Sequence, residues 1–209
     1  MNVRISIDRA LINEMPIGRF TGPIEVIDTP EKLRRALAVI QREPIVGVDT
    51  ETRPSFRAGE VHKVALLQIA TMSRAYLVRL IMTGFTSQLI DFLESDAITK
   101  VGLSLTDDFQ RLTASATFEP RGFLDLQSYV AQFGILDRSL QRIYAIIFGQ
   151  RITKGQQLSN WEAHDLTEAQ RRYAATDAWA CLRIYEHLAQ GHFNPETSPY
   201  RLPDEPPAD

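Results

Sequence analysis

Acidic residues stand at three places where an acid is costly, and their spacing suggests divalent-metal chemistry. Asp49 and Glu51 lie two residues apart at the end of the apolar segment 45–48. Alternation along a strand would put both carboxylates on one face, about 7 Å apart. Like charges that close repel each other, and they persist only where water or a cation offsets the repulsion. The pair therefore indicates either a cation site or a solvated strand end.

A second acid, Asp177, falls on the buried face of a long expected helix. Steps of three and four residues along segment 168–190 give one inward stripe, made up of Tyr173, Asp177, Cys181, Ile184 and Leu188. A buried carboxylate needs a partner or a metal, because isolated burial costs several kcal/mol. Tyr173, one turn earlier, can place its hydroxyl beside Asp177. The alternative is an Asp bonded to a neighbouring strand, with Tyr173 filling the core.

The third place is the junction of a strand and a helix at residues 103–112, which contains Asp107 and Asp108. Acids in a first helical turn commonly complement the helix dipole, which contributes about 0.3–1 kcal/mol. Such junctions are also where α/β sheets present functional groups. From these residues alone both interpretations stay open, and Asp108 is a candidate ligand.

The elements that must position these acids form an alternating pattern. Short β-rich segments predict strands at 44–51, 63–71, 73–80 and 99–105. Apolar periodicity predicts helices at 31–41, 85–95, 126–134, 139–149 and 168–190. Thr167 and Gln170 have the spacing of a capping box at the start of the last helix. We therefore expect an α/β fold with a mixed sheet and helices on both faces.

Composition and charge narrow the class of protein. The chain has 209 residues, of which 44% are hydrophobic and 23% charged, so a disordered, collagen-like or disulfide-stapled protein is excluded. The net charge of -3 argues against binding nucleic acid by bulk charge. The single cysteine fits a reducing compartment. The sequence has neither a signal-peptide pattern nor a run of about 18 apolar residues, so we expect a cytoplasmic protein outside the membrane.

The chain divides into three parts by composition. Residues 1–23 are predicted to form an N-terminal arm, residues 24–190 one compact domain, and residues 191–209 a Pro-rich C-terminal tail. No internal repeat or long linker interrupts the central part.

Three segments in fixed order resemble the DEDD superfamily of 3′-5′ exonucleases, in its tyrosine subtype. They are DTE at 49–51, KVGLSLTDDFQRL at 100–112 and YAATDAWACLRIY at 173–185. The resemblance covers roughly residues 24–190. The spacing of the segments is similar to that of ribonuclease D and, more closely, to that of Werner-type exonuclease domains. Arg172 stands where the histidine subtype has its base, which favours the tyrosine subtype. The resemblance implies a ribonuclease H-like fold.

Residue by residue, the resemblance implies a catalytic set of Asp49, Glu51, Asp108, Tyr173 and Asp177. The four acids would bind two divalent ions, Mg²⁺ or Mn²⁺, and Tyr173 would position the attacking water and help to deprotonate it. The expected partner is the 3′ end of DNA or RNA, and the expected products are nucleoside 5′-monophosphates. The choice between DNA and RNA and the oligomeric state stay open.

Substrate contacts are less well defined by the sequence. Thr52 stands where relatives often carry a bulky residue, and residues 53–56 diverge from the family pattern. The predicted substrate contacts are Thr52, Arg53, Lys63, Phe109 and Lys154. The alternative function is a catalytically weak nucleic-acid-binding or scaffolding module of the same fold, which loss of a metal-binding acid would mark. A ribonuclease H-like endonuclease is a further alternative, which the YAATD segment disfavours.

Overall fold

The sheet is centred on its two longest strands, one of which carries the first acidic motif. The computed structural model describes residues 3–57 and 59–203. Its strands are β1 (Ile24–Ile27), β2 (Ile45–Thr52), β3 (Val64–Ala70), β4 (Ala75–Arg79), β5 (Thr99–Gly102) and β6 (Phe123–Asp125). They form one six-stranded sheet in the order β1-β4-β3-β2-β5-β6. Strands β2, β3 and β4 are a meander of antiparallel neighbours, whereas β1, β5 and β6 pair in parallel, so the predicted mixed sheet is confirmed.

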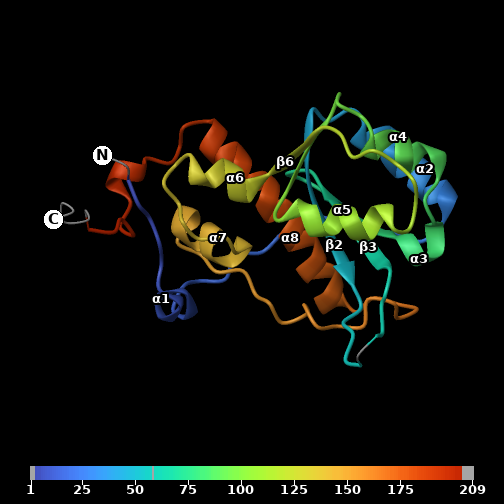
Figure 1. Cartoon of the computed structure of the whole chain (residues 1–209), viewed down its shortest axis with the longest axis horizontal. Helices are drawn as coiled ribbons and strands as arrows, with labels where there is room; N and C mark the ends of the chain where they lie inside the picture. The colour runs from blue at the N-terminus through green and yellow to red at the C-terminus, as the bar shows by residue number, and fades with distance from the viewer. Residues whose placement is uncertain (1–2, 58, 204–209) are drawn as a thin grey trace.

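Helices cover both faces of this sheet, as predicted (Figure 1). They are α1 (Arg9–Asn13), α2 (Pro30–Ile40), α3 (Leu80–Thr83), α4 (Ser87–Leu93), α5 (Leu105–Thr113), α6 (Leu126–Ala131), α7 (Leu140–Phe148) and α8 (Glu168–Ala189), with a 3-10 turn at Pro195–Thr197. Helices α2, α4 and α5 pack in one apolar cluster, and α6, α7 and α8 in another on the opposite side of the sheet. Among the described residues, no helix combines the length and the apolar character needed to cross a bilayer.

Strands β1 and β6 and the short helices α1 and α3 were not predicted. For the two strands, the short length of the segment explains the omission. Strand β1 has four residues, three of them only partly buried, and β6 has three. Segments that short carry no clear alternation, and they are held by pairing in parallel with β4 and β5. The predicted strand 99–105 ends at Gly102. There Ser104 takes a left-handed conformation with φ of 59°, which turns the chain into α5.

Helix α8 lies directly on β2 and β3, and one glycine makes this contact close. A side chain added at Gly47 would put its Cβ 1.9 Å from the carbonyl oxygen of Ala178. The missing side chain therefore lets the backbone of α8 touch β2 two residues before Asp49. The start of α8 is fixed by the predicted capping box, since Thr167 and Gln170 each bond the other's backbone. Helix position and helix register together place Asp177 against β2.

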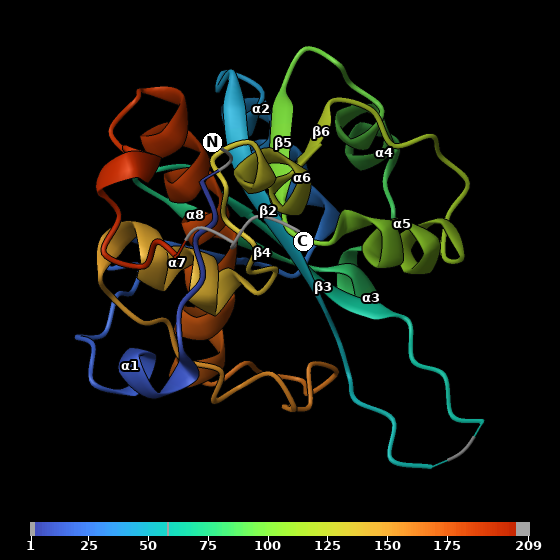
Figure 2. The same ribbon diagram turned by 60° about the vertical axis from the view of Figure 1, so that its left-hand side comes forward.

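The described parts of the N-terminal arm and the C-terminal tail pair with each other at the left-hand end of Figure 1, which is turned toward the viewer in Figure 2. The Ser6 amide donates to the Tyr200 carbonyl at 3.1 Å, and the Leu202 amide to the Arg4 carbonyl at 2.7 Å. Ile5 is fully buried against the cluster around α6 and α7. Residues 1–2 of the predicted arm and 204–209 of the predicted tail lie outside the described residues. The three-part division stays a prediction.

We expect Gly47→Ala to destabilise the protein by at least about 2 kcal/mol, because the added methyl group must push α8 away from β2. Thermal unfolding followed by circular dichroism in EDTA measures this loss. Gly155→Ala is the matched control, since a Cβ at Gly155 meets no atom within 4 Å. Equal melting temperatures for the two variants would show that the close contact has no energetic importance.

Candidate active site

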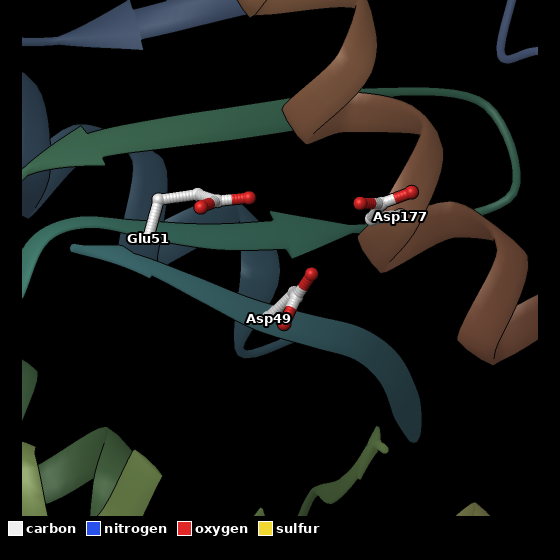
Figure 3. A group of neighbouring side chains, drawn as sticks. All are labelled: Asp49, Glu51 and Asp177. Atoms are coloured by element: carbon white, nitrogen blue, oxygen red, sulfur yellow. The ribbon is translucent and has the colours of Figure 1, made fainter. Parts of the chain in front are cut away.

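Three of the predicted acids converge between β2 and α8. Asp49 and Glu51 project from the same face of β2 toward α8, and Asp177 projects from α8 toward them (Figure 3). One carboxylate oxygen from each of the three residues lies within 4.8 Å of the other two. Strand alternation and the helical stripe thus bring together residues that are far apart in the chain. We call Asp49, Glu51 and Asp177 the carboxylate trio.

The negative charges of the carboxylate trio are unfavourable, because Glu51 and Asp177 are buried and Asp49 is partly buried. Glu51 is 9% exposed and Asp177 is 7% exposed. Burial, with added repulsion from Asp49 and Asp177, raises the pKa of Glu51 to about 10. Burial raises the pKa of Asp177 to about 7, and the pKa of Asp49 is raised by burial and by the charge of Asp177. The three groups cannot all ionise together unless a positive charge joins them.

The donor set of the trio fits a hard divalent cation. Carboxylate oxygens are the ligands that Mg²⁺ and Mn²⁺ prefer, and three of them face one point. A bound cation would also supply the positive charge that lets the trio ionise. The trio therefore has both the geometry and the electrostatic need for a metal ion.

Tyr173 lies beside Asp177, where the helical spacing predicted it. Burial and the charges of Asp177 and Glu51 raise the pKa of the Tyr173 hydroxyl above its usual value, so the hydroxyl keeps its proton. A hydrogen bond from this hydroxyl lowers the pKa of Asp177 and partly opposes the effect of burial. The ring packs against fully buried Trp161, with the centroids 6.0 Å apart. Tyr173 is thus a fixed hydrogen-bond donor at the edge of the trio.

Asp108 reaches the site from the opposite layer of the fold. Helix α5 packs on the other face of the sheet from α8, and the Thr50 hydroxyl on β2 donates to Asp108 Oδ1 at 2.6 Å. Burial raises the pKa of Asp108 to about 6, although this hydrogen bond lowers it. The neighbouring Asp107 is exposed to solvent. Asp108, rather than Asp107, therefore faces the strand that carries the trio.

Sequence reasoning missed Thr50, which binds Asp108. The available signal was its position between Asp49 and Glu51, because alternation turns it to the opposite face of β2, toward α5. A second feature sets where α5 begins, since Asp125 at the end of β6 accepts from the Leu105 amide at 2.8 Å. Both contacts fix Asp108 relative to β2.

A cavity of about 430 Å³ lies over the trio and Tyr173. Its wall includes Thr52, Leu103, Leu140, Leu158 and Cys181. The cavity is also lined by two basic residues with exposed side chains, Arg111 and Lys154. The charge of Lys154 lowers the pKa of Asp177. The acids thus face a concave space that also has positive charge.

The predicted substrate contacts lie in different surroundings. Thr52 and Lys154 line the cavity. Arg53 forms an ion pair with Glu162 at 3.2 Å, and Lys63 is exposed just before β3. Phe109 packs edge-on against Phe123, with the ring centroids 4.7 Å apart, and both partly buried rings lie against the apolar cluster of α2, α4 and α5. The roles of all five residues in substrate binding stay predictions.

Comparisons with known proteins agree on one family. A family model described as 3′-5′ exonuclease matches residues 24–191. The human exonuclease mut-7 homolog is 30% identical over 181 residues, which are 73% of this chain and 21% of that protein. An Arabidopsis thaliana 3′-5′ exonuclease is 28% identical over 201 residues, covering 88% of this chain and 70% of that protein. The chain thus spans about a fifth of the human relative's length.

The fold is similar to that of solved ribonuclease D structures. The Trypanosoma brucei ribonuclease D in complex with RNA U12 superimposes with a TM-score of 0.71 at 20% identity, over 86% of this chain and 64% of that one. This likeness supports the ribonuclease H-like architecture that was predicted from the resemblance.

Metal-free protein is expected to lose stability as the pH rises from about 4 to 8. Asp108 and Asp177 have pKa values of about 6 and about 7 when folded, against an ordinary aspartate value of 3.8, so the folded state binds more protons in this range. Asp177→Asn removes one charge, and at pH 8 in EDTA it should raise the melting temperature by about 4 °C or more. The difference from wild type should vanish near pH 4. Asp107→Asn, on an exposed side chain, is the control, and a pH-independent difference for Asp177→Asn would contradict the expectation.

Thr50→Val tests the contact that holds Asp108. Loss of the hydroxyl leaves a partly buried carboxylate without its donor, which should cost about 1–3 kcal/mol at pH 8 and less where Asp108 is protonated. Urea unfolding at pH 8 and pH 5 measures both values. In the control, Thr52→Val, the hydroxyl removed is buried without a hydrogen bond to any described residue, so little stability is lost. Similar losses in both variants would mean that the bond to Asp108 contributes nothing.

Proposed function

Because the chain belongs to the 3′-5′ exonuclease family of the DEDD superfamily, we propose that it hydrolyses DNA or RNA one nucleotide at a time from the 3′ end, releasing nucleoside 5′-monophosphates. The observation that carries this proposal is the carboxylate trio at the bottom of a cavity that also has basic residues. A solved structure of similar fold contains RNA, which supports a nucleic-acid substrate.

The metal would be held by this chain's four acids. Asp49, Glu51 and Asp177 would hold one divalent cation, Mg²⁺ or Mn²⁺, because their oxygens already face one point. Asp108, held by Thr50 on the other side of β2, would serve a second ion together with Asp49. When bound, a pair of such ions stabilises the negative charge that develops on the attacking and leaving oxygens of a phosphodiester.

The protein's own residues would position the other participants. The Tyr173 hydroxyl lines the cavity and keeps its proton, so it is suited to orient a water molecule by hydrogen bonding rather than to act as a free base. Lys154 and Arg111 line the same cavity and would bind the phosphates on either side of the scissile bond. Phosphate contacts of this kind do not depend on base identity, so the same groups suit DNA and RNA.

The test uses 5′-labelled single- and double-stranded DNA and RNA incubated with Mg²⁺ or Mn²⁺. Wild type should give a ladder that shortens from the 3′ end, and EDTA should abolish it. Asp49→Asn and Asp177→Asn should reduce the rate at least about 10³-fold, and Tyr173→Phe about 10²-fold or more. Chromatography of the products should identify 5′-monophosphates.

Asp107→Asn is the matched control for the acid variants, since it changes an exposed carboxylate beside Asp108 and should keep full activity. Immediate release of a labelled mononucleotide would indicate degradation from the 5′ end and contradict the proposal. Equal activity of wild type and the Asp49 and Asp177 variants would also overturn it. Binding of nucleic acid without any hydrolysis would favour the scaffolding alternative.

A further inference from the structure

Gln68, in the middle of β3, is a buried polar residue whose side-chain amide has no hydrogen-bond partner in the described part of the chain. The residue is fully buried, and neither its amide nitrogen nor its amide oxygen forms a hydrogen bond with any described residue. Each unpaired buried polar group costs about 1–3 kcal/mol. The rest of β3 (Val64–Ala70) is apolar and fully buried, so a leucine or methionine would be the less costly choice at this position. Packing alone therefore does not explain a glutamine here.

The position of Gln68 points to the carboxylate trio. In the antiparallel pair of β2 and β3, Gln68 is directly opposite Asp49. Side chains opposite each other share a face of the sheet, with Cβ atoms about 4.5–5.5 Å apart. Asp49 faces α8, and α8 packs on both β2 and β3. The amide of Gln68 therefore lies in the same buried layer as the trio, within reach of a carboxylate.

The Asp49 carboxylate accepts a hydrogen bond from its own strand, and the Gln68 amide would add a second donor. Asp49 Oδ1 accepts from the backbone amide of Thr50 at 2.9 Å. This bond orients one edge of the carboxylate from its own strand. Metal-binding carboxylates commonly have a further hydrogen-bond donor that fixes their orientation, and its loss weakens metal binding 10- to 100-fold.

We propose that Gln68 is a positioning residue of the metal site, whose side-chain amide donates to the carboxylate of Asp49 and holds it in the orientation that binds the cation. This inference rests on the proposed function, because it needs a metal at the trio. It adds a residue from β3 to a site otherwise built from β2, α5 and α8. Gln68 would touch neither the nucleic acid nor the metal.

Calorimetric titration of the full chain with Mn²⁺ tests the proposal without measuring activity. Gln68→Met keeps an unbranched side chain of similar length but removes the amide. We expect its Mn²⁺ affinity to fall about 10-fold or more, while its melting temperature in EDTA equals or exceeds that of wild type. Leu66→Met is the matched control, since Leu66 lies on the same face of β3 opposite Glu51 and carries no polar group. Its affinity should stay within about twofold of wild type.

The outcomes separate this inference from the proposed function. If wild type binds no Mn²⁺, the metal site fails and the inference fails with it. If wild type binds Mn²⁺ and Gln68→Met binds it equally well, only the role of Gln68 is overturned. A lower melting temperature of Gln68→Met in EDTA, with unchanged affinity, would likewise show that Gln68 serves packing alone.

A measurement on wild type keeps the proposal testable if Gln68→Met does not fold. In nuclear magnetic resonance spectra, saturation with Mg²⁺ should shift the side-chain amide signals of Gln68 and slow their exchange with water. The side-chain amide of Gln170 is the internal reference, because it is also buried and donates to the Asn160 carbonyl at 3.2 Å. Unchanged Gln68 signals at saturating Mg²⁺ would overturn the proposal.

Discussion

The contact between the backbone of α8 and the glycine in β2 is the constraint on which the site depends. Because Gly47 has no side chain, Ala178 lies against the strand, and the preceding residue, Asp177, reaches the carboxylates of Asp49 and Glu51. The capping box at Thr167 fixes where the helix starts and therefore which residues face the sheet. A side chain at Gly47 would hold α8 farther from the sheet by about the width of a methyl group. Asp177 would then lie farther from Asp49 and Glu51 by a similar distance.

The same contact makes the metal-free site unfavourable. It holds two buried acids and the partly buried Asp49 at one point, and the pKa values of all three rise because the folded protein disfavours their charges. The charge of Lys154 lowers the pKa of Asp177 and so opposes this effect, but the Lys154 side chain is exposed. A divalent cation would convert this repulsion into attraction. Part of the free energy of folding thus offsets the cost of holding these acids together, and the site is preorganised for a metal that its ionised form needs.

Strand β2 connects the two layers of the fold because its side chains alternate. Asp49 and Glu51 face α8 on one side, whereas Thr50 between them faces α5 and binds Asp108. An acid from each helical layer is therefore fixed against the same strand. Gln68, on the neighbouring strand, lies on the α8 side and is placed to support Asp49. One short segment of sequence in this way organises residues from four separate elements.

The sequence by itself determined the features that depend on near neighbours in the chain. Alternation in 44–51 predicted that Asp49 and Glu51 share a face, helical spacing predicted that Asp177 is buried beside Tyr173, and the capping box was read from two residues. These features follow from interactions within one strand or one turn. The order of the three motifs also identified the family.

Only the tertiary structure decided which of these groups meet across the fold. Asp108 joins Thr50 from a position 58 residues away, and the orphaned amide of Gln68 is apparent only once β3 is paired and covered. Strands β1 and β6 are too short to carry their own pattern, and they exist because β4 and β5 offer them a partner. Burial, strand pairing and helix packing are set by contacts between distant segments, and no local pattern of residue types encodes those contacts directly.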